Sequence, residues 1–136
     1  MDRRSPEVIT NSRALVEVMG RWPSFHDADL LEAVRGDGDI EVVVHVFEMT
    51  DRVDAGGYFV LTKHHLVRLQ MLGVTTCDMP MGYEGDILDS ISATASAQGI
   101  VVAFESVVDP DRDWRAVCGE ARIAEVTPCD PKGRPI

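Results

Sequence analysis

The sequence predicts a mainly β domain of the α+β class, in which a curved antiparallel sheet or sandwich of about seven strands is accompanied by one N-terminal helix. After Gly20 the spacing of the apolar residues changes from about 3.6 residues, typical of a helix, to about 2, typical of strands. Short turn signals separate the apolar segments that follow. The 136 residues are 45% hydrophobic and 26% charged, which suits one folded globular domain with a sizeable core.

The expected helix begins at Ser5-Pro6-Glu7, where a capping hydroxyl is followed by a first-turn proline and an acid. Val8, Leu15 and Met19 recur at helical spacing behind this start. Gly20 is a typical residue for a helix C-terminus, because it adopts positive φ without strain. These signals predict one amphipathic helix that opens the chain.

A β-hairpin is predicted next. Residues 28–35 and 40–47 flank Gly36-Asp37-Gly38-Asp39, whose Asp-Gly pair supplies the positive backbone angles of a tight turn. Residues 87–98 fit either an amphipathic helix or an exposed strand, and their alternating Ser/Thr-rich pattern favours the strand. Further strands are expected at residues 58–71, with a bend near Lys63-His64-His65, at residues 74–79, at residues 100–107, and at residues 114–126 as one long or two short strands.

We expect a single domain over residues 1–127 and a flexible C-terminal tail over residues 128–136, which contain three prolines. The N-terminus lacks the apolar stretch of a signal peptide, and no apolar run reaches the ~20 residues of a membrane span. Cys77, Cys118 and Cys129 are odd in number and form no CxxC pair, which argues against a disulfide framework or a zinc knuckle. These features predict a cytoplasmic protein that does not associate with membranes.

The net charge of −10 is the one unusual global property. Nine acidic residues lie between His26 and Gly56, and eight more lie between Cys77 and Asp113. Nucleic acids and anionic lipids are bound by clustered lysines and arginines, so this charge excludes them as partners and favours a basic protein instead. The alternative is that the acidity only maintains solubility.

The segment Trp22-Pro23-Ser24-Phe25-His26-Asp27-Ala28 raises the question of a catalytic or metal site. His26, Asp27 and the following Asp29 are too local in sequence to enclose an ion without a distant ligand. The favoured interpretation is a structural corner. In it Pro23 holds Trp22 extended, Ser24 or Asp27 caps a turn, and the two aromatic rings pack where helix gives way to strand.

Other candidate sites have weaker support. His64 and His65 are adjacent in an expected strand and so point to opposite faces, while His45 lies among valines, as a half-buried structural histidine does. Asp109, Asp111 and Asp113 match the first calcium-ligand positions of an EF-hand, but Trp114 stands where that loop requires glycine. No nucleophile elbow, P-loop or dinucleotide motif is present. We therefore expect no catalysis, no metal and no cofactor.

The stretch Trp22–Ala28, the paired strands ending in His45-Val46-Phe47-Glu48-Met49-Thr50, and Gly57-Tyr58-Phe59-Val60-Leu61 together resemble the bacterial immunity protein 50 family. The resemblance extends from about Gly20 to Val107. Such proteins are predicted to be encoded beside polymorphic toxins and to neutralise them. The resemblance implies a mostly β domain that acts by binding, and it identifies no toxin-contacting residues.

The sequence hypothesis is thus an immunity protein that occludes a cognate bacterial toxin, with a nuclease as the expected kind of toxin because its basic cleft would attract an acidic inhibitor. One alternative is a small metal-binding module or metal-dependent enzyme that uses His26 and Asp27 with His64 or His65. Another is a homodimer that pairs two chains through an exposed sheet edge. The expected partner-binding residues lie in acidic turns: Asp37, Asp39, Asp51, Asp54, Asp109, Asp111 and Asp113.

Overall fold

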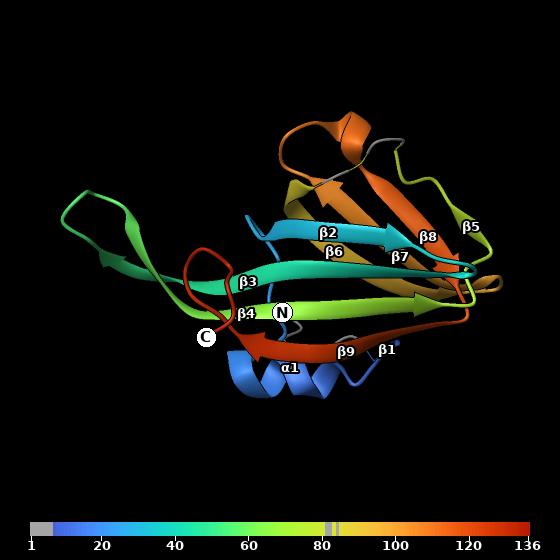
Figure 1. Ribbon diagram of the computed structural model, residues 1–136, viewed down its shortest axis with the longest axis horizontal. Helices are drawn as coiled ribbons and strands as arrows, with labels where there is room; N and C mark the ends of the chain where they lie inside the picture. Colours follow the sequence, from blue (N-terminus) through green and yellow to red (C-terminus); the bar gives the residue numbers. More distant parts are fainter. Residues whose placement is uncertain (1–6, 81–82, 84) are drawn as a thin grey trace.

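The computed structural model describes residues 7–80, 83 and 85–136 (Figure 1). In this part of the chain one α-helix and one 3-10 turn accompany nine strands. The elements are β1 (Ile9–Thr10), α1 (Ser12–Met19), β2 (Asp29–Arg35), β3 (Asp39–Val53), β4 (Phe59–Leu72), β5 (Thr76–Cys77), β6 (Asp86–Ser96), β7 (Gly99–Ser106), η1 (Pro110–Arg112), β8 (Trp114–Cys118) and β9 (Glu120–Pro128). The predicted mainly β fold with one helix is confirmed.

The strands form one open mixed sheet in the order β1-β9-β4-β3-β2-β6-β7-β8-β5. Two features account for the nine strands where about seven are predicted. The short β1 pairs in parallel with β9, and Gly119 divides residues 114–126 into β8 and β9. The Gly119 amide donates to the Leu72 carbonyl, which fixes the turn between them. Residues 87–98 lie in β6 and the turn after it, so the strand interpretation is correct.

The helix begins later than predicted. Residues 9 and 10 form β1, and α1 starts at Ser12 with Asn11 at its N-cap. The Asn11 side chain donates to the Ile123 carbonyl, so this turn is tied to β9. Ser5 and Pro6, the predicted start signals, lie outside the described residues. Gly20 ends the helix as predicted, with φ of 83°.

The sheet is strongly curved because its two halves meet over a very short ladder. β2 pairs with β6 only through Asp29 and Leu30, and β6, β7 and β8 then lie behind β2, β3 and β4 (Figure 1). Apolar side chains of both halves form one core. It includes Val42 and Val44 of β3, Val102 and Phe104 of β7, and Leu15 of α1. No helix in the described residues is long and apolar enough to cross a membrane.

Candidate functional site

The tryptophan-to-aspartate segment forms a tight corner between α1 and β2. Phe25 and Asp27 adopt positive φ of 63° and 64°, and the Ala28 amide donates to the Phe25 carbonyl across the turn. The Ser24 hydroxyl accepts from the His26 amide at 3.2 Å, so Ser24 rather than Asp27 makes the expected side-chain bond. The Asp27 amide donates to the Leu88 carbonyl, which attaches the corner to β6.

The aromatic residues of this corner pack into the core, as the structural interpretation predicts. Phe25 is 5% exposed, and the Trp22 ring meets it edge-on at 5.4 Å between centroids. Both rings line a small internal cavity together with Val44 from one half of the sheet and Ile91 from the other. Pro23 is also buried. The corner thus fills the space between the two halves of the curved sheet.

His26 stands on the outside of the corner. Its Nδ1 lies 3.0 Å from Asp89 Oδ1, and its Nε2 lies 3.7 Å from Asp27 Oδ2. This arrangement places one imidazole between two exposed carboxylates. Within the part of the chain that the structure describes, no group of three His, Cys, Asp or Glu side chains is placed to hold a metal ion.

The seven acidic residues expected to bind a partner lie in three separate places. Asp37 lies in the β2–β3 turn and Asp39 begins β3, whereas Asp51 and Asp54 lie at the opposite end of β3. Asp109, Asp111 and Asp113 surround η1 at the top of the molecule in Figure 1. The fold therefore distributes these charges over several turns and does not gather them in one patch.

Some of these carboxylates also build the turns that present them. Asp54 Oδ1 accepts from the amides of Gly56 and Tyr58, and Asp109 Oδ1 accepts from the Asp111 amide. Asp113 Oδ1 accepts from the Ser106 amide at 2.7 Å. Turn formation therefore explains Asp54, Asp109 and Asp113, since these residues satisfy backbone donors there.

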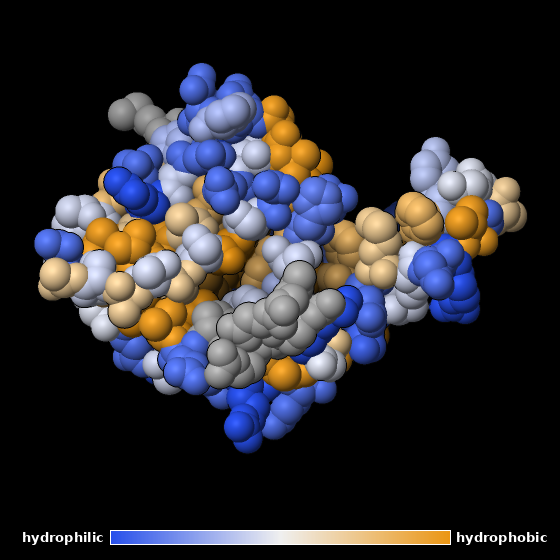
Figure 2. Space-filling view, turned by 180° about the vertical axis from the view of Figure 1, so that it is seen from behind, coloured by the Kyte–Doolittle hydropathy of each residue, from blue (hydrophilic) through white to orange (hydrophobic). Residues whose placement is uncertain are grey.

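A long hairpin projects from the body of the molecule (Figures 1 and 2). We call residues 47–62, the outer ends of β3 and β4 with the turn between them, the arm. The β2–β3 ladder ends at His45, and the β4–β9 ladder begins at His65. In the described structure the arm is therefore a two-stranded ribbon with both edges unpaired. It is longer than predicted, because the strand expected over residues 40–47 continues as β3 to Val53.

Hydrogen bonds define the shape of the arm. The Asp54 amide donates to the Tyr58 carbonyl at 2.8 Å across the turn, and Gly57 adopts φ of 86° within it. The Thr50 hydroxyl donates to the Val60 carbonyl at 2.7 Å. All residues from 51 to 59 are exposed. The arm thus keeps its conformation without burying its side chains in the core.

The base of the arm is fixed to the helix by a β-bulge. Val46 pairs with His65 and Glu48 with Thr62, so Lys63 and His64 together oppose Phe47. This bulge is the bend predicted near these residues, and Lys63 adopts φ of 55° there. The Lys63 ammonium donates to the Met19 carbonyl at the end of α1 and lies 3.0 Å from a Glu48 carboxylate oxygen.

The bulge also produces a histidine pair that the sequence interpretation missed. His45 is 3% exposed, and its Nε2 lies 2.9 Å from Nδ1 of His64. Burial lowers the pKa of His45, and the neighbouring His64 lowers it further, while Asp29 opposes the shift. The sequence interpretation considered His45 by itself, and the structure corrects this by pairing it with His64. The available signal was the predicted bend, which redirects His64 toward the face that carries His45.

The C-terminal segment covers this pair. Pro128 still belongs to β9, and the Cys129 amide donates to the His64 carbonyl at 3.1 Å. Cys129 is buried, and Asp130 Oδ1 accepts from the amides of Lys132 and Arg134. Burial raises the pKa of the Cys129 thiol. Residues 128–136, expected as a tail, thus fold back onto the front of the sheet (Figure 1).

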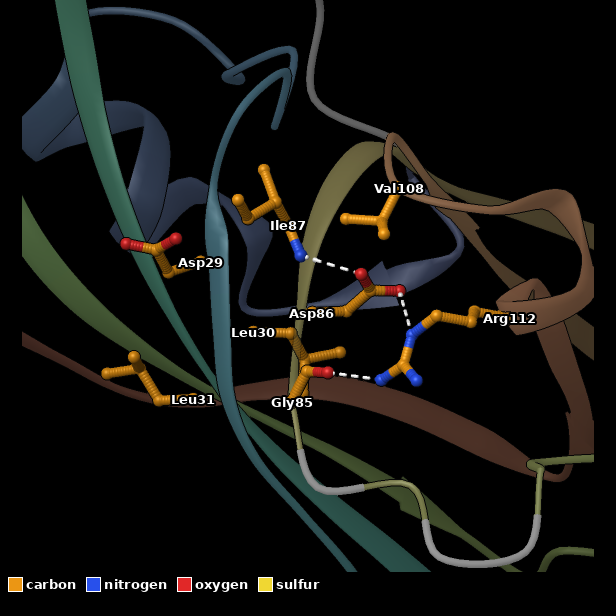
Figure 3. Close-up of a pocket in the computed structure, with 8 residues that line it drawn as sticks. All are labelled: Asp29, Leu30, Leu31, Gly85, Asp86, Ile87, Val108 and Arg112. Carbon is orange, nitrogen blue, oxygen red and sulfur yellow. Dashed lines mark hydrogen bonds and ion pairs between the residues drawn. The ribbon is translucent and has the colours of Figure 1, made fainter.

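A shallow cleft of about 360 Å³ lies where β2 and β6 part (Figure 3). Arg112 from η1 reaches Asp86 at its base, with 3.4 Å between Nε and Oδ2, and also donates to the Gly85 carbonyl. The Arg112 guanidinium lies over the Tyr83 ring at 5.1 Å. Arg112 thus serves to attach η1 to β6.

No family model, curated protein or solved structure matches this chain, so the resemblance to the immunity protein 50 family stays a prediction.

Proposed function

We propose that this chain is an immunity-type protein that neutralises a cognate bacterial toxin by binding and occluding it. The observation that carries the proposal is the display of carboxylates on exposed turns of a chain with a net charge of −10. Asp37 and Asp111 are exposed in two different turns, and Asp51 is exposed near the outer end of β3. Such a surface attracts a basic protein from several directions and repels nucleic acid and other acidic proteins.

A nuclease toxin suits this chemistry best. A nuclease that binds the phosphate backbone has a cleft lined by lysines and arginines. Carboxylates presented on turns can occupy that cleft in place of phosphates, which accelerates association at low ionic strength and makes it sensitive to salt. The resemblance of the Trp22–Ala28 segment and the following strands to immunity proteins supports the same class of function.

Growth protection tests this proposal. The chain is co-expressed with a toxin domain encoded beside it, as the proposal requires, and survival is measured over a range of inhibitor expression. Two double variants, Asp37→Asn with Asp39→Asn and Asp51→Asn with Asp111→Asn, remove exposed charge without removing the turn bonds of Asp54, Asp109 and Asp113. We expect each to weaken binding of the purified toxin domain about tenfold at low salt.

The matched control is the double variant Glu7→Gln with Glu17→Gln, which removes the same charge from exposed positions at the start of the chain and on α1. It should protect as well as the wild type. Failure of the wild-type chain to protect against the toxin domain would contradict the proposal. Equal loss in all three double variants would show that only net charge matters, and it would contradict the role of the turns.

A further inference from the structure

The arm exposes apolar side chains that the fold does not use. Met49 pairs with Leu61 and Val53 pairs with Phe59. Residues opposite each other on paired strands share a face, and Leu61 and Phe59, two apart on β4, join the two pairs into one strip. On β3 a register shift lies between Met49 and Val53. All four are exposed: Met49 by 48%, Leu61 by 37%, Val53 by 58% and Phe59 by 54%. Tyr58, at the turn, is 75% exposed.

The exposed strip is unusual because the arm does not need it. A two-stranded hairpin gains little stability alone in water, and the arm is held by the turn bonds of Asp54 and by its attachment through Lys63. Polar residues at these positions would keep those bonds and would protect unpaired strand edges from aggregation. Clustered exposed apolar side chains of this kind are typical of a surface that another protein covers.

Charge distinguishes between the two kinds of protein that can cover the strip. Asp51 and Asp54 lie exposed beside it, and Glu48 lies at its base. Two copies of this chain each carry a net charge of −10 and would repel each other. Their pairing would also bring carboxylates of the same kind together at the arm. A basic partner would pair with the same groups. The charges therefore favour a different, basic protein over a second copy.

We propose that the arm inserts its apolar strip into an apolar groove of a protein partner whose rim carries lysines and arginines. The strip supplies buried contact area, and Asp51 with Asp54 faces the basic rim. Phe59 is the expected anchor, because large aromatic side chains at the centre of an interface carry much of the binding energy. The identification of this partner as the toxin rests on the proposed function. The docking of the arm rests only on its exposed apolar side chains and the carboxylates beside them.

Photocrosslinking in the native host tests the docking. The amino acid p-benzoylphenylalanine replaces Phe59 in one variant and Val34 in a matched control, since Val34 on β2 is 52% exposed but lies away from the arm. We expect position 59, and not position 34, to crosslink to a protein with an excess of lysine and arginine. A crosslink to a second copy of this chain, equal crosslinking from both positions, or no crosslink from position 59 would overturn the proposal.

Binding of the captured protein, once purified, gives a second readout. Phe59→Ser should weaken its affinity at least about tenfold, whereas Val34→Ser should leave the affinity unchanged. Both positions are exposed, so both variants should unfold within about 2 °C of the wild type. An unchanged affinity for Phe59→Ser would overturn the insertion of the arm.

The two proposals fail in distinguishable ways. If Phe59→Ser protects growth against the toxin domain as well as the wild type, the insertion of the arm is wrong and the immunity function stands. If the basic protein captured at position 59 is not toxic and is not inhibited, the immunity function is wrong and the docking surface stands.

Discussion

Phe25 is the residue on which the corner between α1 and β2 depends most. Its ring is buried between the two halves of the sheet and contacts Trp22. We expect Phe25→Ala to lower the free energy of unfolding by about 3 to 5 kcal/mol, because it leaves a cavity that the surrounding strands cannot close. Urea denaturation measures this loss. Val34→Ala, at an exposed position, should cost less than about 0.5 kcal/mol, and an equal loss in both variants would refute the architectural role of the corner.

His45 gives the stability a pH dependence whose sign follows from its burial. Its folded-state pKa lies below the ordinary value of 6.5, so the unfolded chain binds a proton at higher pH than the folded chain does. Its contribution to stability is therefore complete above pH 6.5 and is lost as the pH falls below that value. We expect the free energy of unfolding to decrease between pH 6.5 and about pH 5, above the range in which most carboxylates titrate.

One substitution separates this effect from the titration of other groups. His45→Leu removes the buried imidazole and should reduce the slope of stability against pH in this window. Denaturant titrations at several pH values provide the measurement. A wild-type stability that does not change across the window would contradict the assignment.

Residue patterns predicted the corner and missed the histidine pair for different physical reasons. Trp22, Pro23 and Phe25 lie within four consecutive positions, so their role follows from local chemistry. The contact between His45 and His64 depends on a bulge that changes which face His64 occupies. Sequence periodicity predicts an extended strand with regular alternation, and one inserted residue reverses that alternation.

At the scale of the elements, the β6–β7 hairpin depends on one glycine. Gly99 has φ of 132°, and a Cβ added there would lie 2.5 Å from the Cys118 carbonyl oxygen. We expect Gly99→Ala to destabilise the protein by about 2 to 4 kcal/mol. Gly38→Ala is the matched control, since Gly38 has φ of 84° and a Cβ added there would meet no atom within 4 Å. This substitution should lower the free energy of unfolding by about 1 kcal/mol. Thermal unfolding of both variants measures these losses of stability. A smaller loss for Gly99→Ala than for Gly38→Ala would contradict the role given to Gly99.

The arm should be the least protected part of the long strands in the free protein. Its ladder has no third strand and its residues from 51 to 59 are exposed, whereas the inner halves of β3 and β4 lie at the centre of the sheet. We expect backbone amides of residues 48–61 to exchange with deuterium at least about a hundredfold faster than those of residues 40–46. Equal exchange rates in the two segments would show that the arm is stabilised by contacts that the fold lacks.

Element boundaries were predictable where local turn chemistry sets them. The Asp37-Gly38 turn and the helix end at Gly20 were found because glycine at positive φ gives a sequence signal. The helix start was not found, because Ile9 pairs with Ala121, a contact 112 residues away in sequence. The length of the arm was also missed. Asp51 and Arg52 are polar, as in a loop, and β3 continues through them across a register shift in its ladder with β4.

At the scale of the whole molecule, the charge follows directly from composition, but its arrangement does not. The sequence places Asp37 and Asp51 fourteen positions apart, and the length of β3 places them at opposite ends of the sheet. The acidic turns consequently surround the body on several sides, and the apolar arm projects beyond it. Binding of a basic partner should therefore weaken as salt is added, with an apolar contribution at the arm that salt does not remove.

Hydrogen–deuterium exchange of the complex with the purified basic partner captured at position 59 tests the central claim most directly. We predict that amides of residues 48–61 become strongly protected on binding, and that residues 31–35 of β2 keep the exchange rates of the free protein. Protection of β2 alone, or no protection at the arm in a saturated complex, would contradict the claim that this protein acts by inserting the arm into a basic partner.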